Sequence, residues 1–210
     1  MATYKITVAY DGTRYNGWQI QRNTDNTIQG KISAVLSKMT GSMVEVHGSG
    51  RTDAGVHAKG QVASFEINGN YSNTEILAYL NRYLPDDIAV LTVEKVDSHF
   101  HARLSCRQKT YRYRIHTSII PDVFNRKYVY TYLDKPLDVN KMRRAAALLI
   151  GTHDFKAFCG NPHFKKSSVR TIISININAD AITDILASKD RQRAGFTAPP
   201  QGLTLMGAEY

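Results

Sequence analysis

A glycine-rich stretch holds the residue types best suited to chemistry. Gly48, Gly50 and Gly55 fall within eight residues, a density that indicates special backbone dihedrals or a close approach to a ligand. Arg51 and Asp53 lie between them, two positions apart. A neighbouring guanidinium favours the ionised carboxylate, which can then act as an acceptor or a nucleophile at neutral pH. The alternative is a turn that carries an ordinary surface ion pair.

Histidines raise a further alternative for this stretch, a metal site. The four considered are His47, His57, His99 and His101. Asp53 and His57 have the spacing of neighbours on one helical face, but Gly55 between them disfavours a helix. No set of three or four ligands converges in the sequence, so we predict no metal and interpret His57 as a residue that structures the loop. A metal-dependent phosphohydrolase using Asp53 and His57 would instead be inhibited by chelators.

The charge balance favours a polyanionic partner. The 27 lysines and arginines outnumber the 18 aspartates and glutamates, which gives a net charge of +9 and a pI near 9.5. Such a surplus suits a nucleic acid, because each neutralised phosphate releases condensed counterions. Twelve tyrosines add aromatic faces that can stack on unpaired bases. Arg14, Arg22 and Arg103 are candidates for phosphate contacts.

Other bulk properties favour a cytoplasmic protein. No apolar run approaches the ~18 residues of a membrane span, and the N-terminus has the pattern of a strand rather than that of a signal peptide. Two cysteines, Cys106 and Cys159, form neither a disulfide framework nor a four-cysteine zinc site. We therefore expect a reducing compartment and no membrane partner.

The elements that would position the glycine-rich stretch follow a regular order in residues 1–105. Apolar residues alternate over residues 4–10, which predicts a half-buried strand, and recur on one helical face over residues 28–39. Gly41 ends that helix. The remaining elements are strands at 43–47, 61–67 and 88–96 and a helix that stops at Pro85. The order strand, helix, strand, strand, helix, strand predicts a split β-α-β, ferredoxin-like unit.

Residues 106–210 begin in the same way. A strand is predicted at 107–117, a helix at 137–150 with Asp138 as its cap and Gly151 as its stop, and a strand at 168–178. We therefore predict an α+β protein whose two ferredoxin-like halves share one mainly antiparallel central sheet with flanking helices.

The pattern breaks between Asn178 and Ala179. A short helix at 179–187 follows directly, before a last strand at 203–206. If the halves match, a strand and a long helix are missing here, roughly thirty or more residues by the usual size of such elements. A natural deletion, an engineered truncation and disordered residues absent from the printed sequence would each explain the gap.

One string carries a specific resemblance. Gly-Arg-Thr-Asp-Ala-Gly-Val-His at residues 50–57 resembles the active-site motif of the tRNA pseudouridine synthase A family almost letter for letter. The resemblance extends, in the family's order and over nearly the whole chain, to residues 10–19, 84–88, 100–103, 109–113, 187–191 and 197–203.

The resemblance implies roles for individual residues. Asp53 would be the catalytic aspartate, and Arg51 would pair with it and help to displace the target base. Tyr111 would pack against the uracil ring and assist removal of the C5 proton, although its alternating strand also suits a core aromatic. By the same strand alternation, Arg112 would point to the other face, toward phosphate or another protein layer. An arginine that the family places in the missing segment has no counterpart, so the pocket of this chain would be incomplete.

The resemblance also implies a substrate and an assembly. The substrate would be the anticodon stem-loop of tRNA, at uridines 38 to 40, and the protein would form a homodimer. No cofactor is expected, because the rearrangement neither oxidises nor hydrolyses anything. The alternative from another class is a non-catalytic RNA-binding protein of the same fold, which the gap after Asn178 favours.

Overall fold

The computed structural model describes residues 1–159, 167–178 and 198–210. The chain forms two compact units. The first unit takes in Met1–Tyr113, Lys127–Val129 and Pro199–Tyr210, and the second takes in Arg114–Arg126 and Tyr130–Ala198.

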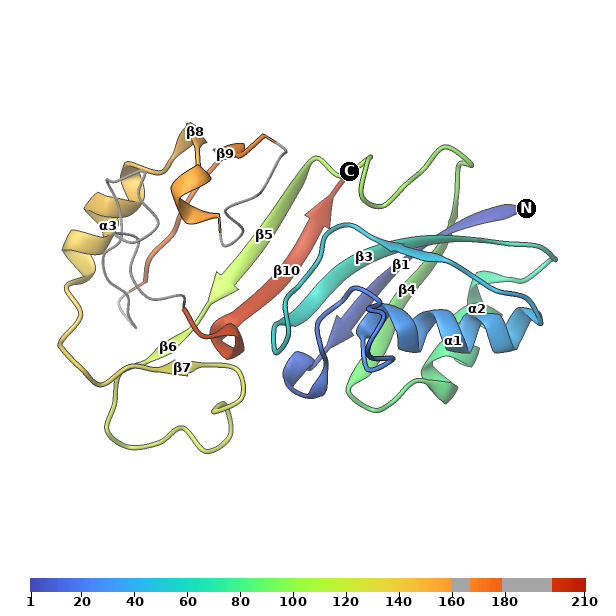
Figure 1. The fold of residues 1–210 in the computed structure, drawn as a ribbon, viewed down its shortest axis with the longest axis horizontal. Coiled ribbons are helices and arrows are strands. Elements are labelled where there is room, and N and C mark those ends of the chain that lie inside the picture. The colour runs from blue at the N-terminus through green and yellow to red at the C-terminus, as the bar shows by residue number, and fades with distance from the viewer. Residues whose placement is uncertain (160–166, 179–197) are drawn as a thin grey trace. The chain divides into compact units, whose positions relative to one another are not determined.

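A six-stranded sheet and two helices build the first unit (Figure 1). Its elements are β1 (Ala2–Tyr10), α1 (Ile28–Thr40), β2 (Val46–Gly48), β3 (His57–Ile67), α2 (Asn73–Tyr83), β4 (Ile88–Val96), β5 (Gln108–Tyr113) and β10 (Leu203–Glu209). The strand order is β4-β1-β3-β10-β5, and β2 pairs with the later part of β3. All neighbours run antiparallel except β10 and β3. The prediction of a mainly antiparallel sheet in a mixed helix and strand protein is confirmed.

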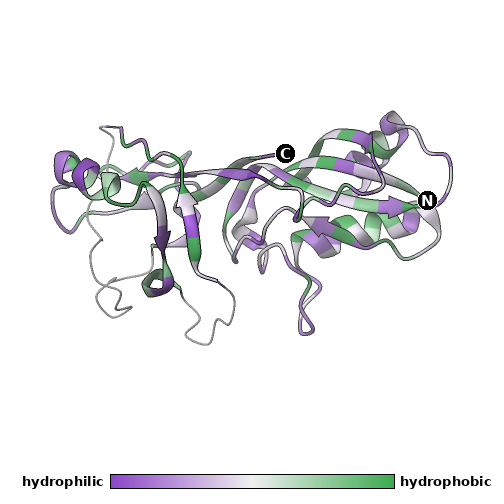
Figure 2. Cartoon of the chain, turned by 90° about the horizontal axis from the view of Figure 1, so that it is seen from above, coloured by the Kyte–Doolittle hydropathy of each residue, from purple (hydrophilic) through white to green (hydrophobic). Residues whose placement is uncertain are grey.

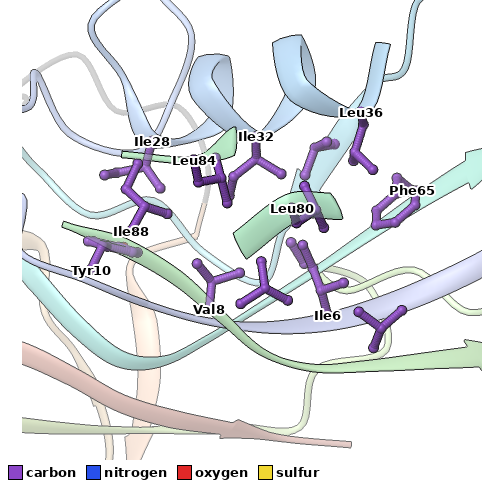
Figure 3. Close-up of a cluster of buried hydrophobic side chains, with 14 of the residues drawn as sticks. Ile6, Val8, Tyr10, Ile28, Ile32, Leu36, Phe65, Leu80, Leu84 and Ile88 are labelled. Atoms are coloured by element: carbon purple, nitrogen blue, oxygen red, sulfur yellow. The ribbon is translucent and has the colours of Figure 1, made fainter. Parts of the chain in front are cut away.

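The core of the first unit lies between the sheet and its helices. Figure 3 shows Ile28 and Ile32 of α1 pointing toward Val8 of β1, and all three side chains are fully buried. Helices and strands of this unit carry hydrophobic and hydrophilic residues in turn (Figure 2), so that one face of each element can be buried. The apolar periodicities therefore place α1 and α2 against the sheet.

Local signals set the ends of these helices. The Thr27 side chain accepts a hydrogen bond from the Gly30 backbone N–H, and Ser72 and Glu75 form a reciprocal capping box at the start of α2. Gly41 follows α1 with φ of 69°, the left-handed conformation expected of it.

The second unit contains shorter elements. They are β6 (Ile115–His116), β7 (Tyr130–Thr131), α3 (Val139–Ala147), β8 (Gly151–Asp154) and β9 (Val169–Ile172). Strands β6 and β7 form a parallel pair, and β8 and β9 form an antiparallel pair. Asp138 caps α3 as expected, because its Oδ1 accepts from the backbone N–H groups of Asn140 and Lys141 at 3.0 Å each.

Several expected boundaries in the second half differ in the structure. The strand predicted at 107–117 is divided into β5 and β6, which pair with different strands. Helix α3 ends at Ala147, and the backbone N–H of Leu148 donates to the carbonyl of Ala145, a three-residue spacing that tightens the last turn. Gly151 instead opens β8.

The strand predicted at 168–178 is also shorter than expected, since β9 covers Val169–Ile172 alone. The helix predicted at 179–187 lies outside the described residues.

Candidate active site

The glycine-rich stretch forms the connection between β2 and β3. Strand β2 ends at Gly48 and β3 begins at His57. Within the loop, Arg51 and Asp53 are exposed, whereas Thr52 between them is buried. The charged side chains of Arg51 and Asp53 are thus exposed to solvent, on either side of the buried Thr52.

Thr52 is held by two residues from the beginning of the chain. Its Oγ1 lies 2.8 Å from the Tyr10 hydroxyl, and its carbonyl accepts a hydrogen bond of 3.0 Å from the Trp18 backbone N–H. Burial raises the pKa of Tyr10 to about 12, against the opposite effect of its hydrogen bonds to Thr52 and Gln61. Tyr10 is therefore a neutral partner for Thr52 at physiological pH.

Both ends of the loop are also fixed. At its start, the Ser49 hydroxyl donates to Oε1 of Gln61 at 2.7 Å, and Nε2 of Gln61 donates to the Gly50 carbonyl at 2.9 Å. At its end, the Val56 N–H donates to the Asp53 carbonyl at 3.1 Å. The start of the loop is thus tied to β3 and its end is closed by a turn, which together give Asp53 a defined position.

Tyr111 lies in the same cross-strand row as the start of β3. Tyr10 pairs with Ala58, Ala58 with Leu205, and Leu205 with Tyr111. Directly paired residues point to the same face of a sheet. The first three are buried, but Tyr111 at the end of the row is 49% exposed, so part of its side chain is free to contact a ligand. Burial, and then the neighbouring Cys106, raise the pKa of Tyr111.

Arg51 is placed beside the loop by a neutral side chain. Its Nε donates to Oε1 of Gln19 at 3.1 Å. Among the ion pairs of the described residues, none joins Arg51 to Asp53 within 4.0 Å. The pairing expected from the sequence is therefore not formed in this structure.

The arginine candidates for phosphate contact differ in their surroundings. Arg22, Arg103 and Arg112 are exposed. Arg14 is 74% exposed in its side chain but forms an ion pair with Asp87, with Nη2 2.5 Å and Nε 3.0 Å from Oδ2.

Sequence reasoning missed the network around Asp87. Tyr15 donates to its other carboxylate oxygen, and the Asp11 backbone N–H donates to its carbonyl at 2.9 Å. Burial alone would raise the pKa of Asp87, but the hydrogen bonds from Tyr15 and Arg14 outweigh it and hold that pKa below the usual value. The partners are about 70 residues apart in sequence, so no local signal pointed to them.

Neither a cluster of metal ligands nor a membrane-spanning helix occurs in the described residues. Residues 1–159, 167–178 and 198–210 contain no group of three or more His, Cys, Asp or Glu side chains that could hold a metal ion. No helix in the described part of the chain is both long and apolar enough to cross a bilayer.

Comparison with known proteins gives the class of enzyme. A family profile described as tRNA pseudouridine synthase matches residues 6–105 and 145–181, which together exceed half of the chain. The first matched segment contains the whole loop with Arg51 and Asp53. The chain belongs to the tRNA pseudouridine synthase family, and this places it among the isomerases that act on tRNA uridines.

Individual relatives carry one more specific name. The chain is 40% identical to tRNA pseudouridine synthase A of Bacillus sp. (strain KSM-64) and 37% identical to that of Brevibacillus brevis, in both cases over 246 positions that span 100% of each chain. It is 45% identical, with the same coverage, to a tRNA pseudouridine synthase A 2 of Bacillus cereus. Because this chain has 210 residues, 36 internal positions of each alignment lie opposite no residue of it.

Proposed function

We propose that this protein converts uridine to pseudouridine at positions 38 to 40 in the anticodon stem-loop of tRNA, with Asp53 as the catalytic carboxylate. The observation that carries the proposal is the exposed Asp53 on a loop whose start, at Ser49, and buried Thr52 are hydrogen-bonded to side chains of sheet strands. The end of the same loop is closed by a turn, in which the Val56 N–H donates to the Asp53 carbonyl. A carboxylate that acts on a buried base must be presented in a fixed position, and this loop supplies one.

The reaction needs few groups. The bond between N1 and C1′ of uridine breaks, the base rotates, and C5 forms the new bond to C1′. The C5 proton then leaves and N1 gains one, so the product is an isomer of the substrate. Asp53 would attack the sugar or the base, or abstract a sugar proton, and would be regenerated. The base must first leave the RNA stack to reach the carboxylate.

Arg51 and Tyr111 would assist this step. Arg51 is exposed beside Asp53, and among the described residues only Gln19 hydrogen-bonds to its side chain, so its other nitrogens would be available to the displaced base or a phosphate. Tyr111, half-exposed at the end of its row, would stack on the uracil ring and help to remove the C5 proton.

Exposed arginines would bind the RNA backbone. Arg22, Arg103 and Arg112 are exposed to solvent. The side chain of Arg14 also stays mostly exposed, although it forms an ion pair with Asp87. Contacts of this kind position an RNA by its shape rather than by its base sequence.

We also propose a two-half architecture for the chain. The order β4-β1-β3 with β2 on the far side of β3 supports a ferredoxin-like arrangement for residues 1–105. Residues 106–210 would form the matching half without one strand and one helix between 178 and 179. The 36 alignment positions that have no residue in this chain are about the number that one strand, one helix and their loops would need. Intact-mass measurement on the natural protein checks the proposal: 23.5 kDa is expected.

The assembly and location follow from the same function. A homodimer would double the basic surface offered to one tRNA, and the cytoplasm is where its substrate is found. Sedimentation equilibrium tests the first expectation, and twice the chain mass is the result that supports it.

The decisive experiment measures turnover and binding together on an unmodified anticodon stem-loop transcript. The wild-type protein should form pseudouridine, and Asp53→Asn should bind the transcript equally well but form no product. Asp25→Asn, which neutralises an exposed carboxylate outside the loop, is the matched control and should retain turnover. Binding without product in the wild type would instead indicate an RNA-binding protein, and turnover by Asp53→Asn would refute the role of Asp53.

A further inference from the structure

A cluster of polar side chains lies directly behind the end of the Asp53 loop. His57, the first residue of β3, is 3% exposed, and its Nδ1 accepts a hydrogen bond of 3.1 Å from the Gly12 backbone N–H. A side chain on Gly12 would place its Cβ 2.0 Å from the Val56 carbonyl oxygen. The turn that contains Gly12 is therefore in direct contact with the last residues of the loop.

Asp11 extends this cluster away from the loop. Its Oδ1 accepts from the Thr13 backbone N–H at 2.9 Å and lies 3.2 Å from Nδ1 of His57. Burial alone would raise the pKa of Asp11, but hydrogen bonds from Thr13 and Tyr128 hold that pKa below its usual value. Asp11 is thus an ionised acceptor at neutral pH, and hydrogen bonds to an ionised acceptor are stronger than those between neutral groups.

Tyr128 completes the cluster from a distant part of the chain. Its hydroxyl donates to Oδ2 of Asp11 at 3.1 Å, 117 residues away in sequence. Its ring packs edge-on against the His57 ring, with centroids 4.9 Å apart and planes at 66°. One side chain therefore contacts both groups that support the end of the loop.

The course of the chain around Tyr128 is unusual. Lys127–Val129 belongs to the first unit, although Arg114–Arg126 before it and Tyr130 after it belong to the second. Val129, the residue after Tyr128, is 5% exposed. Ordering a short segment has an entropic cost, which the contacts of Tyr128 with Asp11 and His57 offset.

We propose that Tyr128 is a positioning residue for catalysis. It orients Asp11 and His57, these hold Gly12 against Val56, and the end of the loop is thereby fixed three residues from Asp53. The proposal rests on the proposed function of Asp53. It assigns to Tyr128 an effect on the geometry of the reacting carboxylate and not on RNA binding, since none of its contacts in the cluster involves the arginines proposed to bind RNA.

The test compares one conservative substitution with a matched control. Tyr128→Phe removes the hydroxyl but keeps the ring against His57, and Tyr83→Phe makes the same change on a side chain of α2 outside the cluster. A displacement of about 1 Å can lower a rate about 100-fold. We expect Tyr128→Phe to lower kcat about tenfold on the stem-loop transcript, with KM nearly unchanged and the protein still folded at the assay temperature, and Tyr83→Phe to match the wild type.

His57 provides a rescue experiment. His57→Asn retains a side-chain oxygen near the position of Nδ1 to accept from the Gly12 N–H, whereas His57→Ala leaves that buried donor without a partner. We expect His57→Asn to retain severalfold more kcat than His57→Ala.

The outcomes separate this proposal from the proposed function. Wild-type kcat in Tyr128→Phe overturns the positioning role, and so does a loss that appears only as weaker RNA binding or as unfolding. Equal kcat in both His57 variants also counts against it. Asp53→Asn is measured in parallel: if that variant is inactive while Tyr128→Phe is normal, only the positioning role fails, and if Asp53→Asn turns over, the proposed function itself fails.

Discussion

The hydrogen bond between Tyr10 and Thr52 offers the sharpest test of how the loop is held. Tyr10→Phe removes the hydroxyl alone, and Thr52→Val replaces the partner hydroxyl with a methyl group of similar size. The two oxygens are 2.8 Å apart, and both residues are buried, at 5% and 7% exposed. Each substitution therefore leaves a buried hydroxyl without its partner.

The magnitude follows from that burial. Stranding a buried polar group destabilises a protein by about 1–3 kcal/mol. We expect about 1.5 kcal/mol for Tyr10→Phe and somewhat less for Thr52→Val, since Gln61 is a second hydrogen-bond partner of Tyr10 and partly compensates in the latter. For a protein of this size that corresponds to a fall in Tm of about 3–6 °C. Because Thr52 is adjacent to Asp53, kcat should also fall, by about tenfold.

A double-mutant cycle measures the bond itself. Unfolding free energies of the wild type, both single variants and Tyr10→Phe/Thr52→Val should give a coupling energy of about 1 kcal/mol, because the second substitution removes the group that the first left unpaired. Additive effects, within about 0.4 kcal/mol, would mean that the two hydroxyls do not interact and that the loop is held in some other way.

Three further predictions follow from the same site. Gly12→Ala should lower stability by about 2 kcal/mol or more and reduce kcat, because its Cβ would lie 2.0 Å from the Val56 carbonyl oxygen; an unchanged Tm and kcat would contradict this packing. The hydrogen bonds of Asp87 outweigh its burial and lower its pKa. Asp87 should therefore contribute stability that is fully present above its unfolded pKa of about 3.9 and is lost as the pH falls below that value. The unfolding free energy of Asp87→Asn should depend less on pH in the acid range than that of the wild type, and equal pH dependence of the two would rule this out. Tyr111→Phe should bind the stem-loop transcript normally and release product at least tenfold more slowly; a product rate equal to that of the wild type would remove the role of its hydroxyl.

Local signals in the first half were strong enough to predict its elements. The strand expected at 88–96 is β4, and the helix expected at 28–39 is α1 with one further residue at its end. The helices of this half have long apolar periodicities, and they end at clear signals, α1 before Gly41 and α2 before Pro85. Their apolar faces are the ones buried in the core. The ferredoxin-like description of this half stays a prediction.

The second half was harder because its elements are short. A strand of two residues, such as β6 or β7, has too few side chains to show a period. Helix α3 ends early because its last turn has hydrogen bonds with a three-residue spacing. The amino acids at residues 145–149 do not predict that spacing.

The sequence by itself determined which residues are candidates for chemistry and where their loop lies, between two strands of the first half. Its glycines, its charged pair and its specific string are all contiguous, so a single stretch of eleven residues contains them. The family follows from the same string and from the motifs around it.

Only the tertiary structure decided what supports Asp53. Tyr10 is 42 residues from Thr52, and Tyr128 is 117 residues from Asp11. The structure also placed Arg51 against Gln19 and Arg14 against Asp87. Hydrogen bonds and ion pairs between such distant residues depend on how the strands and turns come together in space. No pattern along one stretch of chain could have specified them.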